Sequence, residues 1–180
     1  MNYALFDTAI GSCGVVWGER GIAGVHLPDA NPARTRAGVT RRFPGATPGE
    51  PTPQVQQAID GIVALFRGEK RDLREIVLDV EGLPDFSRRV YELARTIPPG
   101  ATLTYGEVAR RLGTPGMARA VGHALGQNPW PIVVPCHRVT AAAGRAGGFS
   151  APGGVSTKLR LLEIEGALAA ERLPLFASPT

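Results

Sequence analysis

Short runs of apolar residues separated by glycine-containing turns make up the first part of the chain. The runs are Tyr3–Phe6, Gly14–Trp17 and Ile22–Leu27, and turns with glycine stand between them at Gly11 and Gly18–Gly21. Short runs of this kind, joined by such turns, are typical of strands that follow one another in antiparallel order. The pattern therefore predicts a small antiparallel meander at the start of the chain.

The next segment shows little periodicity before a helical pattern begins. Pro28–Pro53 is rich in Pro, Gly, Thr and Arg, and we expect mostly loop there, with one short helix. Thr52 can cap a helix that starts with proline, and apolar residues then recur at helical spacing as far as Gly68. Glu75–Val80 alternates again and predicts one more strand. This part of the chain therefore predicts a small α+β unit in which no catalytic group is visible.

Three helices are predicted in the second half of the chain. The first runs over Phe86–Ile97 and ends at a Pro-Pro-Gly sequence. Thr104 and Glu107 form a T-x-x-E capping box, which opens a short helix over Tyr105–Leu112. After a Gly-Thr-Pro-Gly turn, a third helix runs over Met117–Gln127. Two short helices joined by such a turn have the outline of a helix-turn-helix, which by itself leaves DNA binding and plain helix packing equally open.

The positive charge of the chain lies with these helices. The chain has 180 residues and a net charge of +4. Residues 84–166 hold ten basic and five acidic side chains, so this half carries +5 and the remainder −1. Phosphate groups attract such a surface, although some of the arginines only solvate it. The third helix carries mostly Ala and Gly, which suits a close approach to DNA and suits tight helix packing equally well.

Composition limits the remaining choices. Cys13 and Cys136 are too few for a disulfide scaffold, and three histidines at no ligand spacing add no metal site. The first nine residues contain no Lys or Arg and so do not resemble a signal peptide. No apolar run reaches the roughly 18–20 residues of a membrane span. We therefore expect a soluble protein of the cytoplasm that does not contact a membrane.

Cys136 stands in an unusual setting. An Asn-Pro-Trp-Pro sequence ends the third helix, and the apolar run Ile132–Val134 predicts a buried strand just before the cysteine. His137 and Arg138 follow directly, and positive charge near a thiol favours the thiolate, which is the reactive form. Cys136 is therefore a candidate nucleophile, with a small buried apolar side chain as the alternative. For Cys13, packing is the better interpretation.

The sequence around this cysteine resembles the active-site motif of a known family. Pro135–Val139 (PCHRV) is similar to the motif of the O6-alkylguanine-DNA alkyltransferases, also called methylated-DNA–protein-cysteine methyltransferases. The likeness is strong over residues 84–166 and holds only in outline before them. Further motifs occur in the family's order and close to its spacing: Ile97-Pro98, Thr104-Tyr105-Gly106, Ala118–Gly122, Asn128-Pro129, Gly147–Ser150, Leu161-Leu162 and Glu165-Gly166.

The resemblance implies a DNA repair reaction that each molecule performs once. In this family a guanine alkylated on its oxygen turns out of the duplex, and a cysteine keeps the alkyl group. By similarity Cys136 is that acceptor, His137 is its base acting through a water molecule, and Glu165 orients the imidazole. Asn128 matches the hinge asparagine between the recognition helix and the cysteine segment. Tyr105 resembles the residue that helps to rotate the nucleotide and donates a hydrogen bond to the guanine ring.

The resemblance also implies contacts to DNA. Arg119 looks like the arginine finger that enters the stack where the base has left, although a simple phosphate contact is the alternative. Without the family likeness, Glu165 would be interpreted as a surface carboxylate and Asn128 as a helix cap. The residues expected to contact DNA are Tyr105, Ala118, Arg119 and Arg138.

The expected substrate pocket departs from the family in places. Its lining is expected to include Pro131 on the alkyl side, together with Val139, Phe149 and Ser150. Phe149 stands where the family commonly has Tyr, Thr140 replaces a usual Val or Ile, and the loop after Ser150 is longer than in close relatives. These departures bear on which alkyl groups are accepted rather than on the chemistry.

Together these features predict an α+β fold of two domains. Residues 1–83 would form a small N-terminal α/β domain, ribonuclease H-like by the resemblance, and residues 84–166 a winged helix-turn-helix domain for DNA binding and catalysis. Residues 167–180 would be a tail. The expected partner is double-stranded DNA containing O6-alkylguanine, and the protein is expected to work as a monomer without cofactor or metal.

The expected activity is that of a methylated-DNA–[protein]-cysteine S-methyltransferase, acting on O6-alkylguanine and also on O4-methylthymine. A non-repairing alkyltransferase-like protein that only binds the lesion is the alternative. Such proteins lack the acceptor cysteine, which is present here as Cys136. An unrelated thiol hydrolase would need an oxyanion hole and would not use a basic helix-turn-helix.

Overall fold

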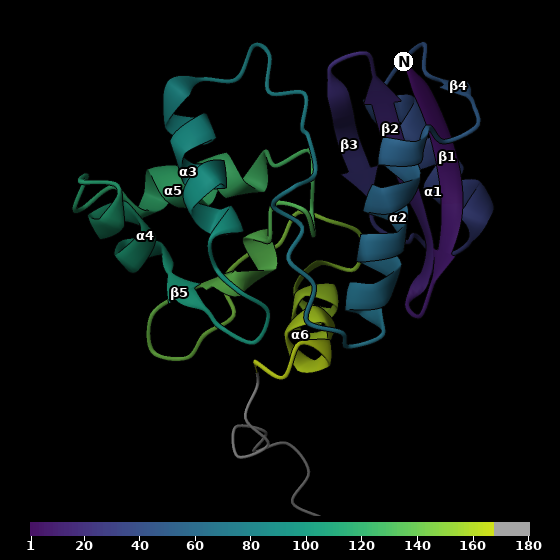
Figure 1. The fold of residues 1–180 in the computed structure, drawn as a ribbon. Helices are drawn as coiled ribbons and strands as arrows, with labels where there is room; N and C mark the ends of the chain where they lie inside the picture. Colours follow the sequence, from purple (N-terminus) through teal and green to yellow (C-terminus); the bar gives the residue numbers. More distant parts are fainter. Residues whose placement is uncertain (168–180) are drawn as a thin grey trace, which may run out of the picture.

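A computed structural model describes residues 1–167 of the chain. The expected tail, residues 167–180, therefore lies outside the described residues apart from Ala167. Two groups of elements lie side by side (Figure 1): a sheet with its helices, built from the first part of the chain, and a cluster of short helices from the second.

The predicted meander is confirmed as part of a four-stranded sheet. Strands β1 (Asn2–Thr8), β2 (Gly11–Gly18) and β3 (Gly21–His26) pair in antiparallel order. The short strand β4 (Thr47–Pro48) adds to β1 in parallel, so that the order across the sheet is β3-β2-β1-β4. Residues of β2 alternate between the two faces, and each face is covered by a helix.

Two helices form the outer layers around this sheet (Figure 1). Helix α1 (Pro32–Arg42) packs through Val39 on the face that carries Val16. Helix α2 (Pro53–Phe66) begins at the predicted cap, where the Thr52 side chain accepts a hydrogen bond from the backbone of the first turn. The one short helix expected within residues 28–53 is therefore present as the 11 residues of α1, whose mostly polar surface gives little apolar periodicity.

The strand expected at Glu75–Val80 is wrong. This segment makes only an isolated bridge between Leu78 and Ile22, closed by the amide of Ile22 donating to the carbonyl of Val77 over 2.9 Å. Val77 itself is 66% exposed. Gly21 explains the close approach: a Cβ there would lie 2.5 Å from the carbonyl oxygen of Val77.

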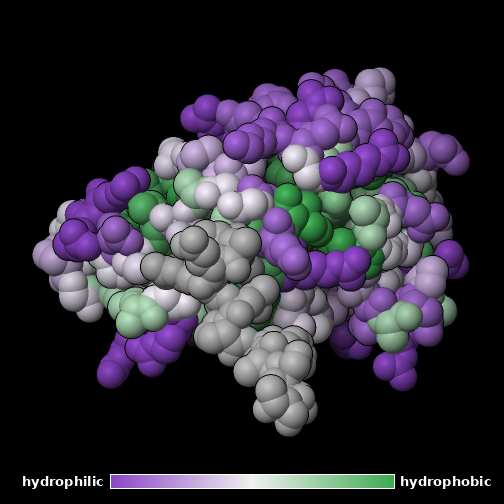
Figure 2. All heavy atoms as spheres, turned by 90° about the horizontal axis from the view of Figure 1, so that it is seen from below, coloured by the Kyte–Doolittle hydropathy of each residue, from purple (hydrophilic) through white to green (hydrophobic). Residues whose placement is uncertain are grey.

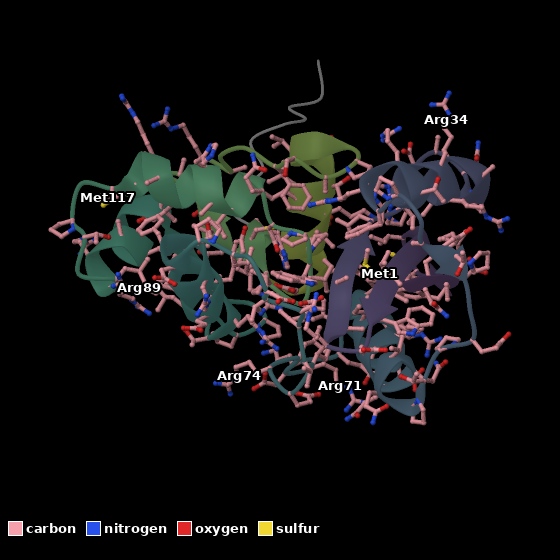
Figure 3. The ribbon with its side chains drawn as sticks, turned by 90° about the horizontal axis from the view of Figure 1, so that it is seen from above. Met1, Arg34, Arg71, Arg74, Arg89 and Met117 are labelled. Atoms are coloured by element: carbon pink, nitrogen blue, oxygen red, sulfur yellow. The ribbon has the colours of Figure 1, made fainter. Side chains whose placement is uncertain are left out.

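The three helices of the second half form where they were predicted. They are α3 (Asp85–Arg95), α4 (Tyr105–Arg111) and α5 (Ala118–Gly126). The capping box is complete, since Thr104 Oγ1 accepts from the amide of Glu107 and the Glu107 carboxylate accepts from the amide of Thr104. Helices α4 and α5 pack against each other and against α3, so that a compact helix pair faces solvent at one end of the molecule (Figure 3).

Short elements complete this half. A single turn of 3-10 helix, η1 (Cys136–Arg138), leads into β6 (Val139–Thr140), which pairs in parallel with β5 (Leu103–Thr104). Helix α6 (Gly154–Ile164) packs against η1 and lies at the base of the molecule between the two groups (Figure 1). The cysteine motif is thus held between a two-stranded ladder and a helix.

The buried strand expected over Ile132–Val134 is wrong. These residues form a turn that is closed by a bridge between Pro131 and Val134. Ile132 has a φ of 79°, which is a strained value for a β-branched side chain. The expectation of burial was right, because Ile132 is 1% exposed and Val134 is fully buried.

One hydrophobic core runs through both halves of the chain and includes residues of β2, α2, α3, α5 and α6. The division near residue 83 stays a prediction. None of the helices within residues 1–167 has the length and apolar character that a membrane crossing requires. Seen from below, hydrophilic residues cover most of the rim and hydrophobic ones gather near the centre of that face (Figure 2).

Candidate active site

Cys136 opens the 3-10 helix η1, directly after the strained turn. Its amide donates to the carbonyl of Val134 over 2.8 Å, and the residue is 9% exposed. Cys13 differs, since it is fully buried in the sheet core, and burial raises the pKa of its thiol to about 12. Cys136 lines two cavities.

Asn128 fixes the backbone that leads to the cysteine. Its side-chain Nδ2 donates to the carbonyl of Val134 over 2.9 Å, and its Oδ1 accepts from the amide of Trp130 at the same distance. Asn128 also follows the last turn of α5 and donates its own amide to Leu125, so it ends the helix as well. The buried side chain therefore ties the end of α5 to the turn that presents Cys136.

A buried cluster of His137, Arg138 and Glu165 lies behind the cysteine. His137 Nε2 lies 2.9 Å from Glu165 Oε1. Arg138 donates to both oxygens of the same carboxylate, over 2.9 Å from Nε and 2.8 Å from Nη2, and a third donor reaches the carbonyl of Ile97. All three side chains are less than a tenth exposed. The structure thus brings Cys136, His137, Glu165 and Asn128 together, as expected for one site.

The charge of this cluster decides which ring nitrogen of His137 can act as a base. Although burial raises the pKa of Glu165, hydrogen bonds from His137 and Arg138 hold it at about 2. The ionised carboxylate can only accept, so His137 Nε2 carries the ring proton. Burial lowers the pKa of His137, which leaves the lone pair of Nδ1 free. Nδ1 is buried and has no hydrogen-bond partner within residues 1–167, so it is available as a general base.

Burial also keeps the thiol of Cys136 in its protonated form. It raises the pKa of Cys136, while the side chain of Asn128 and the charge of Lys158 act in the opposite direction. The thiol is therefore protonated at neutral pH, and its proton has to be removed before it can attack. The expectation that His137 and Arg138 supply positive potential needs correction, because His137 is neutral and Arg138 is neutralised by Glu165.

Arg138 is also misplaced among the residues expected to contact DNA. Its side chain is 6% exposed, and its donors are directed at Glu165 and at Ile97. A DNA phosphate could reach this guanidinium only if the buried ion pair opened. The geometry instead gives Arg138 the role of fixing the carboxylate that holds His137.

Lys158 is a site residue that the sequence reasoning missed. Its Nζ donates to the carbonyls of Val139 over 2.6 Å and Gly148 over 3.2 Å, and it lies 5.7 Å from the ring centre of Tyr105. The side chain is fully buried, and burial lowers its pKa to about 8. The sequence contained a sign that Lys158 is buried, because Lys158 shares one face of α6 with Leu161 and Leu162, the buried residues three and four positions further on.

The first of the two cavities lies against the helix pair and has a volume of about 570 Å³; we call it the helix-side cavity. Helices α4 and α5 and the cysteine turn form part of its wall, and they contribute the expected site residues Tyr105, Ala118, Arg119 and Cys136. The loop before α6 forms the rest of the wall. Arg119 is exposed at its edge, and the Tyr105 hydroxyl donates to the carbonyl of Gly148 over 3.5 Å. The lining consists of Tyr105, Ala118, Arg119, Gly122, Leu125, Gly126, Cys136, Gly148, Phe149 and Ser150.

The second cavity, of about 550 Å³, opens on the other side of Cys136 toward the sheet; we call it the sheet-side cavity. Pro131 lines this cavity and not the first. Val139, expected in the pocket, lines neither and is fully buried, with its carbonyl accepting from Lys158. Val139 therefore contacts Lys158 through its backbone carbonyl and forms no part of the wall of either cavity.

The first part of the chain holds the segment before the cysteine by three hydrogen bonds. Arg42 Nη2 donates to the carbonyl of Asn128 over 3.0 Å, and the amide of Val25 donates to the next carbonyl, that of Pro129, over 2.9 Å. Trp130 Nε1 donates to the carbonyl of Ile22 over 2.7 Å. Three consecutive residues, 128–130, are thus attached to β3 and α1. Local sequence patterns could not predict these hydrogen bonds, because their partners are 86 or more positions apart in the chain.

Within residues 1–167, no group of three or more His, Cys, Asp or Glu side chains is placed to hold a metal ion. The groups near Cys136 can support the removal of a proton from a buried thiol beside a cavity.

Known proteins resemble this chain over most of its length. Residues 85–167 match the family model described as 6-O-methylguanine DNA methyltransferase, DNA binding domain. A methylated-DNA–protein-cysteine methyltransferase of Methanothermobacter thermautotrophicus is 39% identical over 85% of this chain and 78% of its own. One from Mycolicibacterium paratuberculosis is 37% identical over 98% of this chain and 99% of its own.

A solved structure agrees with this result. The crystal structure of Mycobacterium tuberculosis OGT in complex with DNA has a TM-score of 0.74 and 35% sequence identity, and the match covers 93% of this chain and 94% of that one. The mixed α+β arrangement is therefore shared with that protein. One of these relatives is covered almost end to end and the other over more than three quarters of its length, so the chain belongs to the methylated-DNA–protein-cysteine methyltransferase family.

Proposed function

We propose that this protein repairs O6-alkylguanine in double-stranded DNA by transferring the alkyl group to its own Cys136. The family to which the chain belongs carries out direct reversal of DNA damage by alkyl transfer. The observation that carries the assignment to this residue is the position of Cys136. It is a thiol at the wall of a cavity, with the buried His137–Glu165–Arg138 cluster behind it.

The reaction is a single displacement. His137 Nδ1 takes the thiol proton, through a water molecule, while Glu165 holds the opposite nitrogen and steadies the positive charge that develops on the ring. The thiolate of Cys136 forms a bond to the alkyl carbon as the bond from that carbon to guanine O6 breaks. The electron pair stays on the guanine, which becomes neutral by taking up a proton. The thiol proton and the guanine proton balance, so no cofactor is required.

The helix-side cavity is the proposed site of the rotated base. Tyr105 lies on its wall and would donate a hydrogen bond to the guanine ring, which makes the base a better leaving group. Lys158, close to the Tyr105 ring, favours such donation by its charge. Arg119, exposed at the edge of the cavity on α5, would enter the space that the base leaves in the stack. Small residues such as Ala118 on the same helix would let α5 approach the DNA closely.

The finer description of the fold belongs to this proposal. We describe residues 1–83 as a ribonuclease H-like domain and residues 84–166 as a winged helix-turn-helix domain, in which α4 and α5 form the helix pair. Action on O4-methylthymine, the monomeric state and the cytoplasmic location stay predictions from the sequence. The non-repairing alternative is disfavoured by the presence of Cys136 itself.

One experiment tests the assignment. The protein is mixed with a duplex oligonucleotide that contains O6-methylguanine, and the methylated residue is located by peptide mass. We expect one methyl group per molecule, on Cys136. Cys136→Ala should bind the duplex without taking up the methyl group, and Cys13→Ala should react like the wild type. Methylation of another residue, or transfer by Cys136→Ala, would overturn the assignment. Tight binding of the lesion by the wild type without transfer would instead identify the non-repairing alternative.

A further inference from the structure

The charge of the first part of the chain is concentrated on one helix. Although the residues outside 84–166 carry a net charge of −1, α1 contains four arginines and no acidic residue, which gives it a charge of +4. Arg34, Arg36 and Arg41 are exposed, and their side chains make no hydrogen bond or ion pair within residues 1–167. Arg42 differs, because it donates to the carbonyl of Asn128. Helix α1 is therefore a strongly basic surface.

Two of these arginines share one face of the helix. Arg34 and Arg41 are seven positions apart, which is almost two full turns, and about 10 Å apart along the axis. Arg36 lies on another face, where it lines a separate hollow with Glu50. Helix stability does not explain Arg34, because it lies in the first turn, where the helix dipole disfavours positive charge.

This face lies on the side of the molecule that carries the candidate site. Helices α1 and α5 run along the same side, and Arg34 points away from the body there (Figure 3). Arg41 lines the sheet-side cavity, which shares Cys136 with the helix-side cavity. Asp29 also lines the sheet-side cavity, and its carboxylate accepts a hydrogen bond from the amide of Ala30. A duplex whose rotated base entered the helix-side cavity would therefore have α1 beside it.

The spacing of the two arginines suits a DNA backbone. Phosphates follow one another at about 3.4 Å along the axis for each strand, so about 10 Å corresponds to three base steps. We propose that Arg34 and Arg41 contact phosphates of the duplex next to the lesion, which makes α1 a second DNA-contact surface beside the helix pair. This inference rests on the proposed repair of duplex DNA. Such contacts position the duplex and do not read its sequence.

The test measures the affinity for an undamaged duplex at several salt concentrations. The wild type is compared with a double variant, Arg34→Gln with Arg41→Gln. Each phosphate contact contributes about 0.9 to the slope of log affinity against log salt, so the slope of the double variant should be shallower by about 1.8. The same change is expected on duplexes of different sequence. An unchanged slope would overturn the inference.

Arg36→Gln is the matched control. It removes the same charge from the same helix but from a different face, so its slope should equal that of the wild type. If Arg36→Gln reduced the slope as much as each of the other two substitutions does, net charge alone would act and the inference would be overturned. Binding of the undamaged duplex does not depend on methyl transfer. Failure of transfer to Cys136 would therefore overturn the proposed function separately.

A second measurement locates the contact on the DNA. Cys136→Ala binds an O6-methylguanine duplex without consuming the lesion, which fixes the register, and the duplex is then shortened from one end or the other. Because α1 lies to one side of the helix pair, shortening from one end only should abolish the effect of replacing Arg34 and Arg41. An effect that survives both truncations would contradict the inference. So would an effect that sedimentation finds only when two proteins occupy one duplex, because α1 would then contact a second copy of the chain.

Discussion

The two parts of the molecule share one core but keep their charged groups in different places. In the second part, Glu165 is buried with its partners His137 and Arg138. In the first part, Arg20 pairs with Asp79 at the surface, where the arginine side chain is 64% exposed. An exposed pair is screened and contributes little, whereas a buried pair becomes costly when one partner is removed. The second part therefore depends on its charges far more than the first.

The first part acts on the site mainly by neutral hydrogen bonds. Two of its three bonds to residues 128–130 join backbone or indole N–H groups to carbonyls, and only Arg42 contributes a charged donor. Such bonds hold the turn before Cys136 without changing its electrostatics. The division of labour is then that one part supplies the chemistry and the other fixes the backbone that presents it.

The largest expected effect comes from removing the buried carboxylate. Glu165→Gln leaves Arg138 as a buried cation without a counter-charge, and we expect a loss of about 3–5 kcal/mol in the free energy of unfolding. Methyl transfer should fall with it, because His137 loses the acceptor that fixes its tautomer. Urea denaturation and single-turnover rates measure the two effects.

Glu163→Gln is the control for this change. Glu163 lies two residues earlier and is exposed, so its replacement should leave both stability and rate close to those of the wild type. If the Glu165→Gln protein were as stable as the Glu163→Gln protein, the stability of the fold would not depend on the charge of the buried His137–Glu165–Arg138 cluster.

A second effect appears as pH dependence. The pKa of Glu165 is about 2 in the folded protein against an ordinary value of 4.5, so the carboxylate stabilises the fold above about pH 4.5. This contribution, about 3 kcal/mol, is lost as pH falls from 4.5 to about 2. His137, whose pKa is lowered, adds a loss in the same direction below its ordinary value of 6.5.

Urea denaturation at several pH values checks this prediction. The wild type and Glu163→Gln should lose stability steeply between pH 4.5 and about 2, and Glu165→Gln should show a flatter profile in that window. Parallel profiles for all three proteins would mean that other carboxylates, and not the buried one, determine acid sensitivity.

The parts of the fold that could be predicted are those specified by local signals. The glycine turns of the meander, the Thr52 cap and the box of Thr104 and Glu107 each act within a few residues, and each is present. Ile132–Val134 was misassigned because a short apolar run fits a buried strand and a buried turn equally well. Its positive φ at Ile132 is imposed by the surrounding structure.

The candidate site also contains residues that the sequence could identify and residues that it could not. Cys136, His137 and Asn128 could be named because they lie in one recognisable motif series. The direction of the Arg138 side chain could not, since it depends on where α6 packs and on the carbonyl of Ile97, which is 41 positions away. Lys158 and Arg42 are further cases, because their partners are set by tertiary packing alone.

The smallest expected effect comes from removing one of the hydrogen bonds between the first part of the chain and the segment before Cys136. Trp130→Phe keeps an aromatic ring beside Tyr91 but removes the donor to the Ile22 carbonyl, so both stability and transfer rate should fall. Trp17→Phe is the matched control: Trp17 is also buried, and its indole donates no hydrogen bond within residues 1–167. We expect Trp130→Phe to cost about 1 kcal/mol more than Trp17→Phe. Only Trp130→Phe should slow methyl transfer, because only that residue adjoins the cysteine turn. Equal costs and unchanged rates would show that the first part supports the site by packing alone.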